Sequence, residues 1–159
     1  MPIVRRGKMD AHGRRVAIVA SRYNDAVTNK LVDGAVASLA EHGIDPDTLE
    51  IYWVPGSFEV PQMADRIARK GGVDGIVCLG AIIRGETNHF DMLSMSVIRS
   101  VADVQRSSGI PVTYGIVTAE NFRQAMERAG GSVGNKGEES ARALVEMMSL
   151  WEETRGKEA

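Results

Sequence analysis

The sequence predicts a three-layer α/β/α sandwich around a four-stranded parallel sheet. Short apolar runs rich in β-branched residues recur four times along the 159 residues. Most of these runs do not alternate apolar with polar residues, which is typical of strands covered on both faces. Helical patterns separate the runs with short connections, which indicates right-handed βαβ units.

The expected elements follow from local patterns. The four strands are RVAIVA (15–20), EIYWVP (50–55), GIVCLG (75–80) and PVTYGIVT (111–118). A first helix is expected from Asn24 to His42, because an apolar residue recurs at every fourth position and Gly43 supplies a C-terminal stop. Similar periodicity predicts four more helices, around 63–68, 90–104, 122–129 and 144–151. Glycine pairs at 71–72 and 130–131 close the second and the fourth of the five helices.

The chain is predicted to fold as one domain over residues 14–159. It contains no linker, internal repeat or low-complexity tract, and a chain of 159 residues can bury about two thirds of its unfolded surface in one core. Residues 1–13 fit no element of that core. We therefore expect them to form an N-terminal arm.

Composition excludes several classes of function. A formal net charge of -2 gives no electrostatic basis for binding nucleic acid or an anionic membrane. No apolar run approaches the roughly 20 residues of a membrane span, and no secretory signal is expected, so a cytoplasmic protein is predicted. Cys78 is the only cysteine, which excludes a disulfide framework and a cysteine-based metal site. Other metal-ligand spacings, such as His-Glu-x-x-His, are missing as well.

Ligands of open parallel sheets bind beyond the carboxyl ends of the strands. This rule points to four loops: SRYN (21–24), PGSFEVP (55–61), AIIRGETNHF (81–90) and TAEN (118–121). The first three contain the aromatic, acidic and imidazole side chains that a binding site requires. We expect the site to lie among them.

The stretch GAIIRGETNHFD (80–91) leaves an apolar run and turns abruptly polar. The third strand is expected to end at Leu79–Gly80, and Asn88 is expected to cap a helix, with Asp91 completing a capping box. Backbone N–H groups at 85–87 would then be free to bind an anion, assisted by the Thr87 hydroxyl. His89, in the first helical turn, is expected to be neutral near pH 7 and able to accept a proton. The alternative is a surface or packing histidine.

Three other features allow two interpretations each. Tyr23 is either an aromatic platform for a flat ligand or a cap on the core. Glu59 either accepts hydrogen bonds from sugar-like hydroxyls or interacts with a helix dipole. The segment ERAGGSVGNKG (127–137) is either a flexible basic loop for a phosphate or a helix C-cap with solvated charges, and it lacks the Gly-Lys-Ser/Thr order of a P-loop.

In chain order, SRYND, VPGSFEVP, LGAIIRGETNHFD, YGIVTAEN and ERAGGSVGNKG resemble the lumazine synthase family of riboflavin biosynthesis, from about Arg15 to Trp151. The resemblance implies a flavodoxin-like fold without a cofactor. It also implies condensation of 5-amino-6-(D-ribitylamino)uracil with 3,4-dihydroxy-2-butanone 4-phosphate to 6,7-dimethyl-8-ribityllumazine, with release of phosphate and water.

The resemblance also assigns residues. His89 corresponds to the proton-transferring histidine. Residues at the pyrimidine and ribityl chain correspond to Tyr23, Ser57, Phe58, Glu59, Ala81, Ile82, Ile83 and, from an adjacent subunit, Tyr114. Residues at the butanone phosphate correspond to Glu86, Thr87, Lys136 and, again from the adjacent subunit, Arg128. Tyr23 and Tyr114 stand where phenylalanine is usual, and MLSMSVIRS (92–100) departs from the usual continuation, which bears on packing between subunits.

The family's assembly suggests a homopentamer, with twelve pentamers forming an icosahedral capsid, and riboflavin synthase as a candidate partner. A shell scaffold with incidental catalysis is therefore a second hypothesis. An FMN-carrying flavodoxin-like protein would need a loop rich in Ser, Thr and Gly after the first strand, which SRYN does not provide. A receiver domain would need an acidic pair after the first strand and an aspartate ending the third, and AIVASR and IVCLGA offer neither.

Overall fold

A computed structural model describes residues 1–86 and 88–155 and confirms the predicted parallel sheet. Four strands lie in the order β2-β1-β3-β4, and each neighbouring pair is parallel. The strands are β1 (Val16–Ser21), β2 (Glu50–Val54), β3 (Gly75–Ile83) and β4 (Val112–Ala119). No helix among the described residues is long and apolar enough to cross a membrane.

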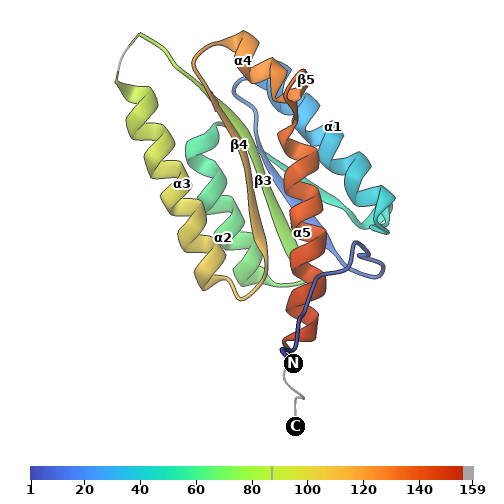
Figure 1. Cartoon of the computed structure of the whole chain (residues 1–159). Coiled ribbons are helices and arrows are strands. Elements are labelled where there is room, and N and C mark those ends of the chain that lie inside the picture. Colours follow the sequence, from blue (N-terminus) through green and yellow to red (C-terminus); the bar gives the residue numbers. More distant parts are fainter. Residues whose placement is uncertain (87, 156–159) are drawn as a thin grey trace.

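Helices cover both faces of the sheet, which confirms the three-layer arrangement (Figure 1). One face is covered by α1 (Asp25–Glu41) and α5 (Lys136–Glu153), and the other by α2 (Val60–Lys70) and α3 (His89–Ser107). A short helix, α4 (Phe122–Glu127), follows β4. Each face of the sheet therefore has its own hydrophobic core, and the strands β1 and β3 contribute to both.

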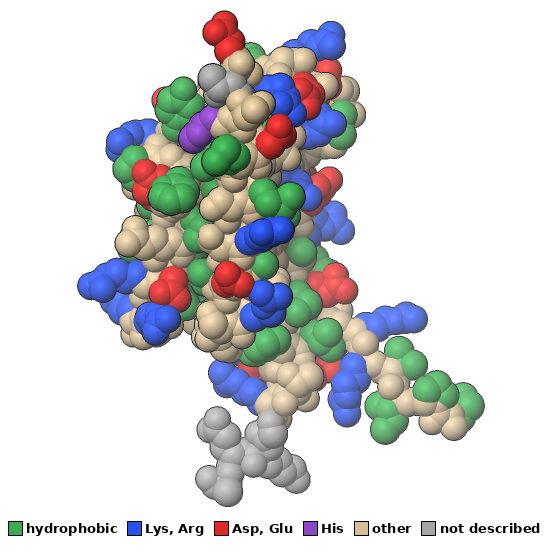
Figure 2. Space-filling view, turned by 90° about the vertical axis from the view of Figure 1, so that its left-hand side faces the viewer, with side chains coloured by type: hydrophobic (Ala, Val, Ile, Leu, Met, Phe, Trp, Pro, Cys, Tyr) green, Lys and Arg blue, Asp and Glu red, His purple; other side chains and the backbone are tan. Residues whose placement is uncertain are grey.

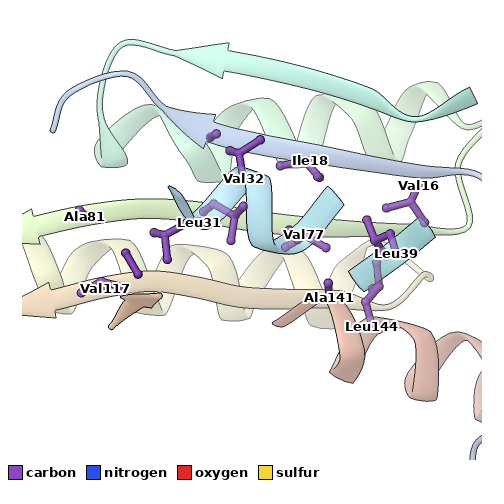
Figure 3. Close-up of a cluster of buried hydrophobic side chains, with 14 of the residues drawn as sticks. Val16, Ile18, Leu31, Val32, Leu39, Val77, Ala81, Val117, Ala141 and Leu144 are labelled. Carbon is purple, nitrogen blue, oxygen red and sulfur yellow. The ribbon is translucent and has the colours of Figure 1, made fainter. Parts of the chain in front are cut away.

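The core beneath α1 and α5 consists of interlocking aliphatic side chains (Figure 3). Ile18, Leu31 and Leu144 are fully buried there, and burial of each such side chain stabilises the fold by about 1.5–3 kcal/mol. The two helices approach each other closely at Gly137, where an added Cβ would lie 2.0 Å from the Leu31 carbonyl oxygen. Only a residue without a side chain permits this approach.

Strand β3 is longer than the sequence analysis predicts. It continues to Ile83 instead of ending at Gly80, because residues 80–83 pair with 116–119 of β4. Ala81 and Ile82 are buried as a result. Residues 81–83, which were predicted to begin a loop, are therefore the last residues of the strand.

Strand β2 is an edge strand, and the expectation that it would be covered on both faces is wrong. Ile51 and Trp53 remain 40% and 43% exposed, whereas Val54 is buried. Helix α1 packs against β1 and β3 and leaves this side of β2 open. The apolar residues of this strand therefore do not indicate that both of its faces are buried.

The glycine-rich segment after α4 begins with Arg128 as the C-cap of that helix and continues as a small hairpin. The predicted helix 122–129 ends at Glu127, and β5 (Ala129–Gly131) pairs with β6 (Gly134–Asn135). Gly130 and Gly134 adopt φ values of 107° and 89°, which glycine tolerates best. The Asn135 side chain accepts a hydrogen bond from the Glu138 N–H and so caps α5 at its first turn.

The N-terminal residues lie along α5 of the same chain (Figure 1). The Lys8 N–H donates to the Ser149 hydroxyl over 2.8 Å, and the Arg5 guanidinium lies 3.9 Å from the Glu153 carboxylate. Ala11 is 1% exposed, and its N–H donates to the His42 carbonyl over 2.7 Å. The segment thus reaches the hydrophobic core through Ala11.

Gly137→Ala is expected to lower the free energy of unfolding by about 2 kcal/mol, because overpacking against the Leu31 backbone outweighs alanine's helix preference of about 1 kcal/mol. Urea denaturation at fixed protein concentration measures the change. Arg142→Ala, an exposed position of the same helix, serves as the control and should change stability by less than about 0.5 kcal/mol. Equal stability of the two variants would contradict the close helix approach.

Candidate functional site

A cavity of about 600 Å³ lies where the carboxyl ends of β1, β2 and β3 meet the start of α3. Its walls come from the segments at the ends of these three strands and from the first turns of α3. The lining residues are Tyr23, Asn24, Gly56, Ser57, Phe58, Glu59, Ala81, Ile82, Ile83, Gly85, His89, Phe90 and Leu93. This cavity therefore lies at the edge of the sheet where the sequence predicts the site, and eight of the predicted site residues line it.

Tyr23 is held at the mouth of this cavity by the backbone around it. The Arg22 and Tyr23 N–H groups donate to the Val54 and Pro55 carbonyls, over 2.7 and 3.0 Å. Asn24 adopts a left-handed conformation (φ 64°), and its side-chain amide donates to the Ala81 carbonyl over 3.0 Å. The Tyr23 side chain is 74% exposed, so the alternative that it caps the core is wrong.

The turn η2 (Ser57–Glu59) forms another wall of the cavity and contacts β3. Phe58 is 66% exposed, whereas Ser57 is buried and Glu59 is half-buried. An added Cβ on Gly80 would lie 2.7 Å from the Ser21 hydroxyl and 2.9 Å from the Ser57 hydroxyl. Glycine in β3 therefore allows both serines to approach the strand beneath the cavity. Glu59 also precedes α2 without capping it through its side chain, so it both lines the cavity and lies at a helix start.

His89 is the first residue of α3 and lines the cavity from the exposed rim. This exposure contradicts the packing histidine but agrees with the alternative of a surface histidine. Asn88 is the N-cap residue, as predicted, but its side chain makes no cap hydrogen bond. The expected capping box is not formed, because the Asp91 carboxylate binds the Arg84 guanidinium instead. Glu86 is exposed, and Thr87 lies outside the described residues.

Tyr114, Arg128 and Lys136 do not line this cavity. They surround a second cavity of about 370 Å³ along β4, the other edge strand, together with Thr118 and Glu139. Arg128 is the C-cap residue of α4 and donates to the Gln124 carbonyl over 3.1 Å, which agrees with the C-cap interpretation. Burial, with a smaller effect of nearby Cys78, raises the pKa of Tyr114 to about 12. The predicted site residues thus form two separate groups within one chain.

Asn24, Phe90 and Leu93 line the first cavity but were not among the predicted site residues. Asn24 and Phe90 stand in two of the loops that the sequence points to, whereas Leu93 lies beyond them within a predicted helix. Phe90 and Leu93 are half-buried, since α3 begins beside the cavity before it crosses the sheet. The i, i+3 spacing of these two apolar residues after His89 is the signal that could have identified them.

The chemistry available in the first cavity is limited and specific. An exposed aromatic ring, a carboxylate and an imidazole face apolar walls formed by Ile82, Ile83 and Leu93. These groups suit a flat heterocycle with a hydroxylated chain, together with one proton transfer. Among residues 1–86 and 88–155, no group of three or more His, Cys, Asp or Glu could hold a metal ion.

Comparison with known proteins gives concordant results. The family model of 6,7-dimethyl-8-ribityllumazine synthase matches residues 13–152. A 6,7-dimethyl-8-ribityllumazine synthase from Pediococcus pentosaceus is 43% identical over 144 residues, which cover 91% of this chain and 92% of the relative. The match includes the residues that line both cavities and the five helices up to residue 152 of α5.

Cys78 is expected to be unreactive in the folded protein. It is fully buried in β3, and this burial raises the pKa of its thiol to about 12. Because the folded pKa exceeds the unfolded value of about 8.5, the thiol's contribution to stability is full below about pH 8.5 and is lost as the pH rises toward 12. Iodoacetamide at pH 8 should modify Cys78 in urea but not in buffer, as measured by mass spectrometry, with Cys78→Ala as the background control. Rapid stoichiometric labelling of the folded chain would refute this.

Proposed function

The chain belongs to the 6,7-dimethyl-8-ribityllumazine synthase family, and from this premise we propose how its residues share the work of the reaction. It is an enzyme of riboflavin biosynthesis that catalyses the lumazine synthase reaction. The substrates are 5-amino-6-(D-ribitylamino)uracil and 3,4-dihydroxy-2-butanone 4-phosphate. The observation that carries the residue assignment is the convergence of an aromatic ring, a carboxylate and an imidazole on one cavity at the carboxyl edge of the sheet.

The pyrimidine occupies the first cavity, with its ring stacked on Tyr23. Phe58 and Ser57 hold the ring and the ribityl chain, and Glu59 accepts hydrogen bonds from ribityl hydroxyls, each worth about 1.5–3 kcal/mol with a charged acceptor. Residues 81–83 border the ring edge through their backbone. A volume of about 600 Å³ supports this assignment, because small-molecule sites typically span about 300–1,000 Å³.

The butanone phosphate binds next to the start of α3, near Glu86 and Thr87. Arg128 and Lys136 neutralise its charge, because guanidinium and ammonium groups form strong charge-assisted hydrogen bonds with phosphate. Amine attack on the ketone expels water and gives an imine, phosphate is then eliminated, and closure of the ring by the ribityl-bearing amine onto the remaining carbonyl expels a second water. His89 moves protons between these steps and contributes about 10²–10⁴-fold, while the larger contribution comes from holding two reactive molecules in one geometry. No cofactor takes part.

The phosphate and pyrimidine groups meet between two subunits. Within one chain Arg128, Lys136 and Tyr114 lie around a separate cavity from His89, which supports a site completed by a neighbouring copy. Helix α3 also leaves Met92, Met95 and Ile98 exposed, on a face where hydrophobic and charged side chains are interspersed (Figure 2). We infer a homopentamer, with twelve pentamers as a capsid and riboflavin synthase as a candidate partner. Residues 14–159 form its single cytoplasmic catalytic domain, and residues 1–13 its arm.

His89→Ala is expected to lower kcat about 10²-fold, because it removes the proton-transferring group. The KM for the pyrimidine should change less than about 3-fold, since the ring contacts are retained. Lumazine formation from both substrates, followed by fluorescence, measures the rates above the uncatalysed background. His12→Ala is the control, because the His12 side chain is 81% exposed in the arm, outside both cavities. An unchanged kcat in His89→Ala would exclude the proposed role.

A shared site predicts complementation between two inactive variants. His89→Ala and Arg128→Ala chains, unfolded together and refolded as a mixture, should recover activity in about a quarter of the sites if assembly is random, because only one pairing keeps both native groups. Steady-state turnover of the mixture is compared with the sum of the separate variants.

The control mixture combines His89→Ala with the double variant His89→Ala/Arg128→Ala, in which no pairing restores a site. If the first mixture were no more active than this control, Arg128 and His89 would not act across a subunit boundary. The activity of the native chain would then be attributed to sites complete within one subunit.

A further inference from the structure

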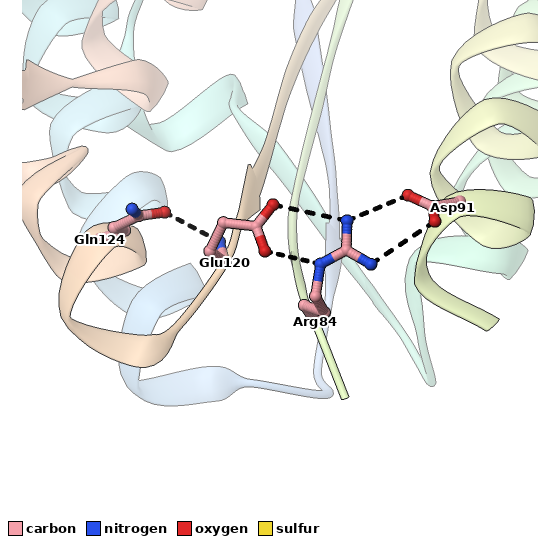
Figure 4. Close-up of polar contacts among 4 residues, drawn as sticks. All are labelled: Arg84, Asp91, Glu120 and Gln124. Atoms are coloured by element: carbon pink, nitrogen blue, oxygen red, sulfur yellow. Dashed lines mark hydrogen bonds and ion pairs between the residues drawn. The ribbon is translucent and has the colours of Figure 1, made fainter. Parts of the chain in front are cut away.

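Arg84 joins three segments at the carboxyl edge of the sheet (Figure 4). Its backbone N–H donates to the Ala119 carbonyl over 2.9 Å, directly after the last residue of β3. Its Nε and Nη2 donate to the two Glu120 carboxylate oxygens over 2.6 and 3.4 Å. Its Nη2 and Nη1 donate to the two Asp91 oxygens over 3.2 and 3.5 Å. One guanidinium therefore connects β3, α3 and the turn after β4.

The same guanidinium also stacks on the wall of the first cavity. The central carbon of Arg84 lies 4.4 Å from the centroid of the Phe90 ring, and Phe90 lines the cavity. Phe90 and Asp91 are the two residues that follow His89 in the first turn of α3. Since Asn88 does not cap the helix through its side chain, Arg84 supplies long-range contacts that fix this turn relative to the sheet.

Glu120 is itself held in place, so the contact is not a loose surface pair. Its backbone N–H donates to the Gln124 side-chain oxygen over 2.8 Å, and Gln124 belongs to α4. Arg84 thus lies between two carboxylates from separate elements. Its planar guanidinium can donate two hydrogen bonds to each of them, which a lysine ammonium cannot do in this geometry.

The exposure of the cluster argues against a role in stability alone. The side chains of Arg84, Asp91 and Glu120 are 36%, 64% and 57% exposed. Ion pairs at such positions contribute only about 0–1 kcal/mol to folding. A displacement of about 1 Å in a reacting group, in contrast, can lower a rate about 10²-fold. Loss of Arg84 should therefore affect turnover much more than folding.

We propose that Arg84 is a positioning residue of the lumazine synthase reaction, which sets the place of His89 through its contacts with Phe90 and Asp91. This inference rests on the proton-transfer role proposed for His89. Arg84 contacts neither substrate, and it acts by orienting the first turn of α3 against the end of β3.

The test is a double-mutant cycle in the full chain, with kcat measured by lumazine fluorescence at saturating concentrations of both substrates. Arg84→Gln should lower kcat about 10-fold in the native background, with less than about a 2-fold change in the pyrimidine KM. In the His89→Ala background the same substitution should change kcat less than about 2-fold, because the group that Arg84 positions is missing.

Arg69→Gln is the matched control, since Arg69 forms an exposed ion pair of 2.8 Å with Asp65 on α2, outside both cavities. Its kcat should equal that of the native chain, and thermal unfolding should give similar midpoints for both arginine variants. If Arg84→Gln lowers the midpoint, Arg84→Lys, which keeps the charge and loses the fork, replaces it in the cycle.

Two results would contradict the positioning role of Arg84 and leave the role of His89 intact. In the first, Arg84→Gln retains native kcat while His89→Ala is slow. In the second, Arg84→Gln lowers kcat by the same factor in both backgrounds. If His89→Ala itself retains native kcat, the proposed role of His89 fails, and the positioning role of Arg84 fails with it. The single variant His89→Ala thus distinguishes the two failures.

Discussion

The pairing of β3 with β4 is the constraint on which the site depends. Residues 80–83 lie opposite 116–119, so the apolar ladder continues to Ile83 and ends only where the Arg84 N–H binds the Ala119 carbonyl. A slip by one residue would turn every side chain of the strand to the other face. This register therefore determines which face of the sheet Ala81 and Ile82 each cover. It also determines the residue at which the polar segment leaves the sheet.

The strand order explains why the cavity lies where it does. In the order β2-β1-β3-β4, the chain leaves β1 toward one edge and leaves β3 toward the other, so the loops after these two neighbouring strands diverge. Such a switch point opens a crevice at the carboxyl edge, where α/β proteins bind ligands. Here Tyr23 follows β1 and His89 follows β3, and the hydrogen bond from Asn24 to the Ala81 carbonyl ties the two strand ends together.

The sequence predicts features that local patterns determine and misses those that distant partners determine. Unalternated apolar runs and 3.6-residue periodicity are local, and the three layers follow from them. Gly80 resembles a strand end, yet its pairing with β4 continues the strand, and Trp53 is apolar yet lies on an open edge. Asp91 has the spacing of a capping box, but a guanidinium seven residues earlier binds it more favourably. The hairpin at 129–135 depends on positive φ angles at its glycines. Glycine allows such angles but does not require them, so the sequence alone does not predict the hairpin.

Charge gives the physical reason for assigning the reaction to two subunits. Among the described residues that line the first cavity there is one carboxylate and one imidazole, and no lysine or arginine. A phosphate that departs as a dianion beside Glu59 and Glu86 would be opposed by like charge, and no cationic side chain among the described lining residues would offset that charge. Arg128 and Lys136, which are proposed to bind the phosphate, both lie at the β4 edge, around another cavity of the same chain. A neighbour that turned its β4 edge toward the first cavity would bring these cations to the leaving group. Assembly would then be needed for the reaction, in addition to covering the exposed apolar surface.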